Sequence, residues 1–153
     1  MKILVTGNAG SGKSTLAKKL SKELSISLYS LDAIVWSSNW KQTPKEEKEK
    51  RIKEILKKDT WVIEGVSKLA LQQSDITYFL DIPTYRCILN ILLRFLKNPI
   101  GSRDELPNNC PEYIGVFKAL KISVLFNRKS KIWILDSKTK HKTIIKSYKN
   151  LPH

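Results

Sequence analysis

The sequence predicts an α/β fold in which a parallel β-sheet is covered by helices on both faces. Short apolar segments alternate with longer segments of helical spacing along most of the 153 residues. A glycine-rich loop follows the first apolar segment and precedes the first helical one. Strands that alternate with helices are joined by crossover connections, which favour parallel pairing. At this length we expect one domain, residues 1–153.

The loop matches G-x-x-x-x-G-K-[ST], the phosphate-binding P-loop. Its glycines let the backbone curl, so that successive N–H groups point at phosphate oxygens. Lys13 is expected to reach the β- and γ-phosphates, and the Ser14 hydroxyl to bind Mg²⁺. A chance Gly/Ser-rich turn is the alternative, but the strand at 3–5 and the helix at 14–24 argue against it. The predicted nucleotide-binding residues are Gly7, Asn8, Ala9, Gly10, Ser11, Gly12, Lys13, Ser14 and Thr15.

The segments that follow extend the alternation. Residues 26–31 alternate apolar and polar side chains, which is typical of a half-buried strand. Thr43 and Pro44 supply a cap residue and a first-turn proline for a helix that runs to about Lys58. Residues 60–65 then form an apolar run that ends in an acid and a glycine, and we predict a third strand there.

The second half continues in the same way, with a strand at 75–81 and a helix at 83–97. Residues 98–111 contain three prolines and one glycine, so we predict a loop or lid. Three further elements complete the prediction: a helix at 112–127, a fifth strand at 131–136 and a last helix at 139–151.

Two acids stand at the carboxyl ends of predicted strands, where open α/β sheets bind their ligands. Asp32 follows the second strand and could lie near the metal or bind an acceptor, or it could simply cap a helix. Glu64 ends the third strand, where a Walker-B carboxylate would hold the Mg²⁺ shell through water. Trp36 and Trp40 lie in a polar stretch, where they could stack on a ring-shaped acceptor or pack over the core edge.

The chain is strongly basic, with a formal net charge of +14. Most of its cations are lysines, and the segment from Lys118 to Lys149 holds a single acid, Asp136. A solvated lysine-rich face explains this better than a dedicated nucleic-acid surface, because arginine provides the planar fork for phosphates. We therefore expect at most non-specific contact with nucleic acid.

Cellular location is suggested by three features. The glycine-rich loop follows Met1 within a few residues, so we expect no signal peptide. The most apolar stretch, 87–96, is too short to span a bilayer. The two cysteines, Cys87 and Cys110, are too few for a disulfide scaffold. These features favour a cytoplasmic protein with reduced thiols and no membrane contact.

The chain resembles adenylate-kinase-like P-loop proteins and, more closely, the family called DNA topology modulation proteins. Besides the P-loop, the resemblance is carried by Leu31-Asp32, Trp36, Trp40, Trp61-Val62-Ile63-Glu64-Gly65, Phe79-Leu80-Asp81-Ile82-Pro83, Arg103, Cys110-Pro111-Glu112 and Trp133-Ile134-Leu135-Asp136-Ser137. It covers nearly the whole chain, although only the P-loop is specific by itself.

The resemblance implies a five-stranded sheet in the order 2-3-1-4-5, ATP or GTP with Mg²⁺ at the loop, and an arginine-bearing lid near 98–111. Arg94 matches a phosphate-clamping arginine of nucleoside monophosphate kinases, and Arg103 lies in the lid. Asn90 stands where another arginine is usual, and Arg86 could replace it. The acceptor-binding insert is reduced here to residues 36–58.

The function favoured by these features is transfer of the γ-phosphoryl group of ATP or GTP to a nucleotide or another small acceptor. The candidate catalytic residues are Lys13, Asp32, Arg94 and Arg103, with Asp32 as the base if the acceptor is a hydroxyl. The alternatives are a nucleic-acid-associated P-loop NTPase or regulator, and a nucleotide-binding protein without transfer activity.

Overall fold

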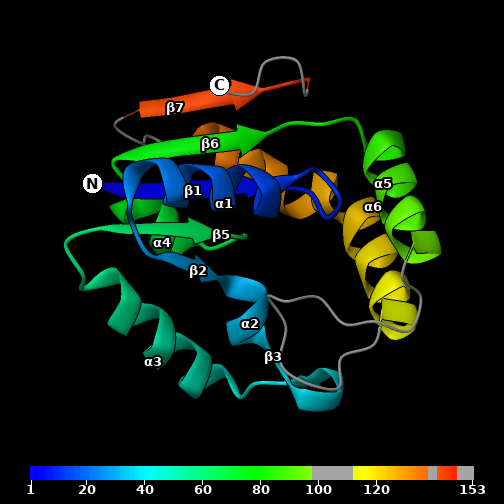
Figure 1. Ribbon diagram of the computed structural model, residues 1–153, viewed down its shortest axis with the longest axis horizontal. Coiled ribbons are helices and arrows are strands. Elements are labelled where there is room, and N and C mark those ends of the chain that lie inside the picture. The colour runs from blue at the N-terminus through cyan, green and yellow to red at the C-terminus, as the bar shows by residue number, and fades with distance from the viewer. Residues whose placement is uncertain (98–111, 138–140, 148–153) are drawn as a thin grey trace.

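The computed structural model describes residues 1–97, 112–137 and 141–147, apart from the side chains of residues 112 and 127–129. Five parallel strands form one sheet in the order β2-β5-β1-β6-β7 (Figure 1). Numbered among themselves along the chain, these strands stand in the order 2-3-1-4-5. Their bounds are β1 Lys2–Gly7, β2 Leu28–Ser30, β5 Trp61–Glu64, β6 Ile76–Leu80 and β7 His141–Ile145.

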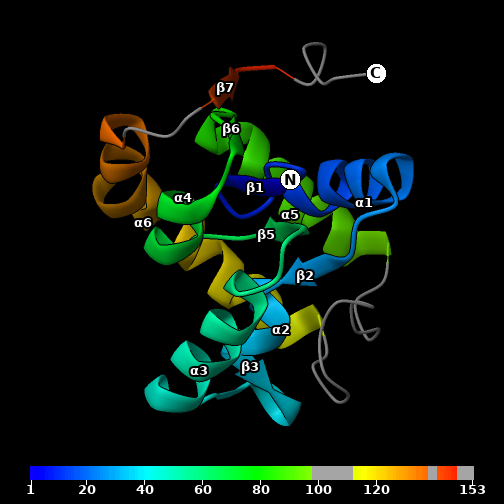
Figure 2. The same ribbon diagram turned by 90° about the vertical axis from the view of Figure 1, so that its left-hand side faces the viewer.

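Helices cover both faces of the sheet, which confirms the predicted fold class. Seen nearly along the strands, α1 lies on one side of the sheet and α4 and α6 lie on the other (Figure 2). The alternation of β1 explains the two layers, since Ile3 and Val5 pack toward α1 while Leu4 packs toward the opposite face. The helices are α1 Lys13–Leu24, α2 Leu31–Val35, α3 Lys45–Leu56, α4 Lys68–Gln73, α5 Thr84–Lys97 and α6 Glu112–Asp136.

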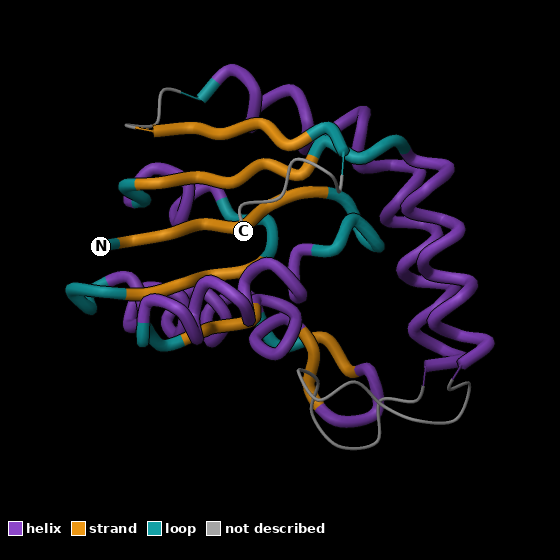
Figure 3. Tube along the Cα trace, turned by 45° about the horizontal axis from the view of Figure 1, so that its top comes forward, coloured by secondary structure: helices purple, strands orange, loops and turns teal. Residues whose placement is uncertain are grey.

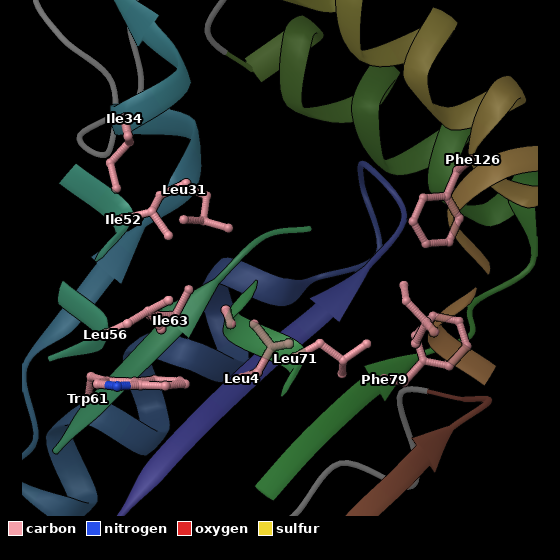
Figure 4. Close-up of a cluster of buried hydrophobic side chains, with 12 residues drawn as sticks. Leu4, Leu31, Ile34, Ile52, Leu56, Trp61, Ile63, Leu71, Phe79 and Phe126 are labelled. Atoms are coloured by element: carbon pink, nitrogen blue, oxygen red, sulfur yellow. The ribbon is translucent and has the colours of Figure 1, made fainter. Parts of the chain in front are cut away.

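The core on the α6 side fixes that helix against the sheet. Figure 4 shows Leu4, Ile63 and Phe79 on neighbouring strands, with Leu71 of α4 and Phe126 of α6 beside them. The rings of Phe79 and Phe126 have their centroids 6.4 Å apart. Both rings are buried, so this contact holds α6 against the sheet near the carboxyl end of β6.

The predicted strand at 131–136 is wrong, because α6 continues through it to Asp136. Ile134 packs in the same core as Phe126, while Ile132 and Leu135 are exposed. Buried positions along α6 recur at helical spacing, namely Val116, Ala119, Ser123, Phe126 and Ile134. A short apolar run looks the same in a buried strand and in a helix, so its periodicity could not decide.

The predicted helix at 139–151 is also wrong for the part that the structure describes. Residues His141–Ile145 form β7, which pairs in parallel with β6 at the edge of the sheet. The Asp81 N–H donates to the Ile145 carbonyl (2.8 Å) and continues this pairing. Ile145 is buried while most of the strand is exposed, so the segment lacks the alternation that marks a strand. Lys142, the charged residue of this strand, is partly buried and donates from Nζ to the Leu135 carbonyl (2.6 Å).

The polar stretch after β2 is ordered into a small hairpin rather than a loop. The 3₁₀ turn η1 (Ser38–Trp40) lies between the antiparallel strands β3 (Trp36–Ser37) and β4 (Lys41–Gln42). Figure 3 shows α5 and α6 side by side beyond the carboxyl ends of the sheet strands, where they pack through Ile91 and Val116. The hairpin and this helix pair therefore provide walls around the ends of the strands.

Two of the sequence predictions concern a membrane span and a lid. Among the residues that the structure describes, no helix combines the length and apolar character needed to cross a membrane. The predicted lid at 98–111, with Arg103 and Cys110, lies outside the described residues.

Candidate active site

The P-loop follows β1 and opens directly into α1, as its sequence predicted. Gly10 (φ 75°) and Gly12 (φ 90°) have left-handed backbone conformations, which L side chains adopt only at a cost. The Ser11 N–H donates to the Asn8 carbonyl (3.2 Å) and closes the turn. The first turn of α1 therefore begins at Lys13 with its N–H groups at the loop.

Gly10 also permits the loop to touch α5. A Cβ at this position would lie 2.3 Å from the carbonyl oxygen of Cys87, a distance that packed atoms do not reach. The Asn90 side chain donates from Nδ2 to the Gly10 carbonyl (2.8 Å). Asn90 thus holds the loop from the position where an arginine was expected.

Cys87 is a structural residue of this contact. Its side chain is fully buried, and its thiol donates to the Ile82 carbonyl (3.6 Å). Burial raises the pKa of the Cys87 thiol, an effect that the positive charge of Lys13 partly opposes. The thiol is therefore protonated at neutral pH and is unsuited to act as a nucleophile.

The side chains of the loop divide into two groups. Lys13 lines the pocket described below and donates from Nζ to the Asn8 carbonyl (2.7 Å). Asn8 and Ser11 are buried instead, and Asn8 donates from Nδ2 to the Ser123 carbonyl of α6 (3.0 Å). The hydroxyl of Ser11 has no hydrogen-bond partner among the described residues. Asn8 and Ser11 could contribute to a phosphate site mainly through their backbone.

Glu64 joins the P-loop to the second strand. Its carboxylate accepts a hydrogen bond from Ser14 Oγ (2.7 Å) and another from Ser30 Oγ (2.8 Å). The parallel register places Ser30 directly opposite Glu64, and Glu64 opposite Val5. Sequence reasoning predicted Ser14 and Glu64 but missed Ser30, whose position at the end of β2 was the available signal.

A pocket of about 700 Å³ lies at the carboxyl ends of β1, β2 and β5, between α2 and the α5–α6 pair. Asp32 and Arg94, both predicted site residues, line it. Arg86 does not, because it points outward and donates from Nε to the exposed Tyr85 hydroxyl (3.2 Å). The predicted residues that line the pocket are Gly7, Ala9, Gly10, Gly12, Lys13, Ser14, Thr15, Asp32, Glu64 and Arg94.

The far end of the pocket is built from Trp36, Trp40 and Lys118, which we call the tryptophan end. The two indole rings meet edge to face, with centroids 5.5 Å apart. The Lys118 ammonium lies 3.9 Å from the centroid of the Trp36 ring and 5.2 Å from that of Trp40. It also donates to the Trp40 carbonyl (3.2 Å). Lys118 was not predicted, because nothing local in the sequence links it to the tryptophans.

Trp40 is held in place by α6. Only 6% of its surface is exposed, and a Cβ added at Gly115 would lie 2.5 Å from its ring. The expectation of packing over the core edge therefore describes Trp40 well. Trp36 is only half-buried and lines the pocket.

The residues at the P-loop end of the pocket fit a nucleotide with Mg²⁺. Lys13 and the N-terminus of α1 provide positive charge where phosphates would lie. Ser14 and Glu64 place two hard oxygen donors side by side, and Mg²⁺ typically combines one or two carboxylates with water and substrate phosphates.

Comparison with protein families gives a match to the N-terminal part of the chain. The family described as the viral superfamily 1 RNA helicase core domain matches residues 3–67. This range holds β1, the P-loop, α1 and β5, so it includes both Ser14 and Glu64. No curated protein matches the chain significantly.

Solved structures match over much more of the chain. The deoxyadenosine kinase from M. mycoides with bound dATP superposes with a TM-score of 0.60 and 14% identity, covering 99% of this chain and 95% of that one. The chain shares the three-layer α/β/α fold of this kinase. An uncharacterized protein from Eubacterium ventriosum ATCC 27560 matches with a TM-score of 0.52 and 16% identity, covering 95% and 89%. At these identities the likeness shows the shared α/β/α fold and says nothing about substrates.

Proposed function

We propose that this protein is a phosphotransferase that moves the γ-phosphoryl group of ATP or GTP to a nucleotide or another small acceptor. The observation that carries the proposal is one continuous pocket, which has the P-loop at one end and the tryptophan end at the other. A volume of about 700 Å³ is within the range of small-molecule sites. A donor phosphate at the P-loop would leave the tryptophan end for a second substrate.

The donor would bind through groups already described. The N–H groups of the P-loop and Lys13 Nζ would hold the β- and γ-phosphates, while Ser14 Oγ and, through water, Glu64 would hold Mg²⁺. When bound, Mg²⁺ neutralises charge that builds up on the phosphate oxygens. Lys13 Nζ donates to the Asn8 carbonyl, which keeps its ammonium at the loop.

The transfer needs an acceptor oxygen in line with the γ-phosphorus. A new P–O bond forms to that oxygen while the bond to the β-phosphate bridge breaks, and the nucleoside diphosphate leaves with the electron pair. A hydroxyl acceptor would give its proton to the Asp32 carboxylate, whereas an acceptor phosphate needs no base. Arg94 would bind oxygens of the group in transit. Arg103 is proposed for the same role from its sequence position alone.

A second candidate is a nucleic-acid-associated NTPase or regulator. It is favoured by the net charge of +14, by the resemblance to DNA topology modulation proteins, and by the partial match to an RNA helicase core. Basic charge alone supports non-specific binding to phosphate backbones. We rank this candidate second because Arg94 lines the pocket and would serve a small phosphorylated ligand there.

Thermal unfolding with and without MgATP tests the donor site. The parent protein should gain stability with MgATP, and Lys13→Ala should lose most of this gain, because each charge-assisted contact contributes about 1.5–3 kcal/mol. Lys19→Ala is the matched control, since Lys19 is an exposed lysine of the same helix that pairs with Glu23 (3.8 Å). A Lys13→Ala protein that MgATP stabilises as fully as the parent would contradict the donor assignment.

Nucleoside diphosphate release separates the two candidates. Transfer predicts that release from MgATP rises when a nucleoside monophosphate or a small hydroxyl compound is added, and that a phosphorylated product accumulates. Release that rises with DNA or RNA, and forms no phosphorylated acceptor, would favour the second candidate.

A further inference from the structure

Lys118 is the cation that distinguishes the tryptophan end from the rest of the pocket. We propose that the second substrate is a small organic anion whose carboxylate or phosphate group binds the Lys118 ammonium. This inference rests on the proposed function, because it assigns the acceptor of that reaction. It also makes a claim about binding that holds without any nucleotide.

Two contacts with the hairpin hold the Lys118 ammonium in position. It lies against the Trp36 ring at 3.9 Å and donates to the Trp40 carbonyl at 3.2 Å. An ammonium provides three N–H donors, and the carbonyl accepts only one of them. A lysine side chain loses rotamer freedom when it binds a ligand, and contacts that already orient it lower this cost.

The same contacts argue against a stacked base as the acceptor. A nucleobase would stack on an open indole face, but the Lys118 ammonium occupies a face of Trp36. Trp40 is almost fully buried, and Gly115 approaches its ring from α6. The tryptophans therefore hold a cation in place, and the part of the ligand that this cation recognises is an anionic group.

Helix α6 gives a scale for the size of the ligand. It contacts Trp40 at Gly115 and contacts the P-loop at Ser123, which accepts from Asn8. At 1.5 Å per residue these two contacts are about 12 Å apart along the helix axis, and Lys118 is about 7–8 Å from the second. A molecule of a few carbons could bind Lys118 by its anionic group and still present an oxygen to a phosphate at the loop.

The cationic side chains that line the pocket form two groups, one at each end, and each group could bind an anion. Lys13, Lys18 and Arg94 come from the P-loop helix and from α5, and they surround the donor end. Lys118 comes from α6 and is the cation of the tryptophan end among the lining residues that the structure describes. An acceptor anion at Lys118 would thus be held apart from the donor phosphates.

Three-carbon compounds with and without an anionic group test the proposal. Glycerol 3-phosphate, glycerate and glycerol share one skeleton, and adenosine provides a neutral ring. Binding is followed by tryptophan fluorescence, since Trp36 and Trp40 border the site, and by thermal unfolding. We expect a saturable response to one or both anions and none to glycerol or adenosine at the same concentration. The stronger of the two anions distinguishes a phosphate ester from a carboxylate.

Variants of Lys118 test whether the anion binds at this residue. Lys118→Gln should weaken anion binding by about ten- to a hundredfold, the effect of one charge-assisted hydrogen bond, while Lys118→Arg should restore part of it. Lys121→Gln is the matched control, because Lys121 is an exposed lysine one turn along α6. Lys13→Ala should leave the anion response intact, so loss of nucleotide binding and loss of this site are distinguishable.

Other results would overturn the proposal. Lys118 could act only as a structural contact between α6 and the hairpin, in which case Lys118→Gln would lower the melting temperature without changing the anion response. An anion response that disappears in Lys13→Ala would place the anion at the P-loop. Adenosine binding that is lost in Trp36→Leu but retained in Lys118→Gln would identify a stacked base instead.

Discussion

Replacing Gly10 by alanine tests the contact between the P-loop and α5. The P-loop motif does not require glycine at this position, so the expectation comes from the structure. The new Cβ would lie 2.3 Å from the carbonyl oxygen of Cys87, and this backbone oxygen cannot rotate away. The left-handed conformation of Gly10 (φ 75°) adds a second cost for alanine.

The expected loss of stability follows from three terms. The left-handed backbone costs about 1–2 kcal/mol, overpacking about 1–3 kcal/mol, and a weakened Asn90 hydrogen bond about 1 kcal/mol. Together they lower the free energy of unfolding by about 3–6 kcal/mol, which is part but not all of a typical total. For a chain of this length the melting temperature should fall by about 6–24 °C.

Gly115→Ala is the matched control. Its Cβ would also meet a neighbour at 2.5 Å, but that neighbour is the Trp40 side chain, and Gly115 lies inside a helix. Alanine gains about 1 kcal/mol of helix propensity there, against about 1–3 kcal/mol of overpacking. Its melting temperature should therefore fall by about 8 °C at most.

Thermal and urea unfolding of both variants measure these losses of stability. The reasoning would be refuted if Gly10→Ala melted with the parent, or if the two variants were destabilised equally. Gly10→Ala should also lose most of the MgATP-dependent gain in stability, because the loop can no longer keep its position against α5. Gly115→Ala should retain that gain.

Three further changes have defined outcomes. Glu64→Gln keeps an acceptor for Ser14 and Ser30 but removes the charge, so MgATP-dependent stabilisation should require higher Mg²⁺ concentrations in a thermal titration. Phe126→Ala removes a buried ring from the core and should cost about 3–5 kcal/mol in urea unfolding, with an unchanged m-value. DNA binding by the parent should be independent of sequence and should fall steeply as salt is raised; tight binding that survives high salt would indicate a dedicated surface.

The sequence was sufficient where structure is determined locally. The strand, loop and helix around the P-loop follow from a motif whose residues are neighbours in the chain. The pairing of Ser14 with Glu64 could be anticipated, because carboxyl ends of parallel strands meet at one edge of the sheet. Arg94 lines the pocket, and its role there, which came from the family resemblance, stays a prediction.

The sequence was insufficient where contacts between residues far apart in the chain determine the structure. The apolar run 131–136 is helical because α6 packs Phe126 and Ile134 on the sheet, and an intrinsic preference for strand cannot outweigh that burial. Ser30 reaches Glu64 through strand register, which a single strand does not reveal. Lys118 meets Trp36 only because α6 crosses the end of the hairpin.

Helix α6 has a consequence for how the two ends of the pocket communicate. Its 25 residues form one continuous rod, about 37 Å long. The rod contacts Trp40 near one end, the P-loop in the middle, and the sheet core beyond it. If a ligand at the tryptophan end changes the affinity for a nucleotide through this rod, thermodynamic reciprocity requires that the nucleotide change the affinity for that ligand by the same factor.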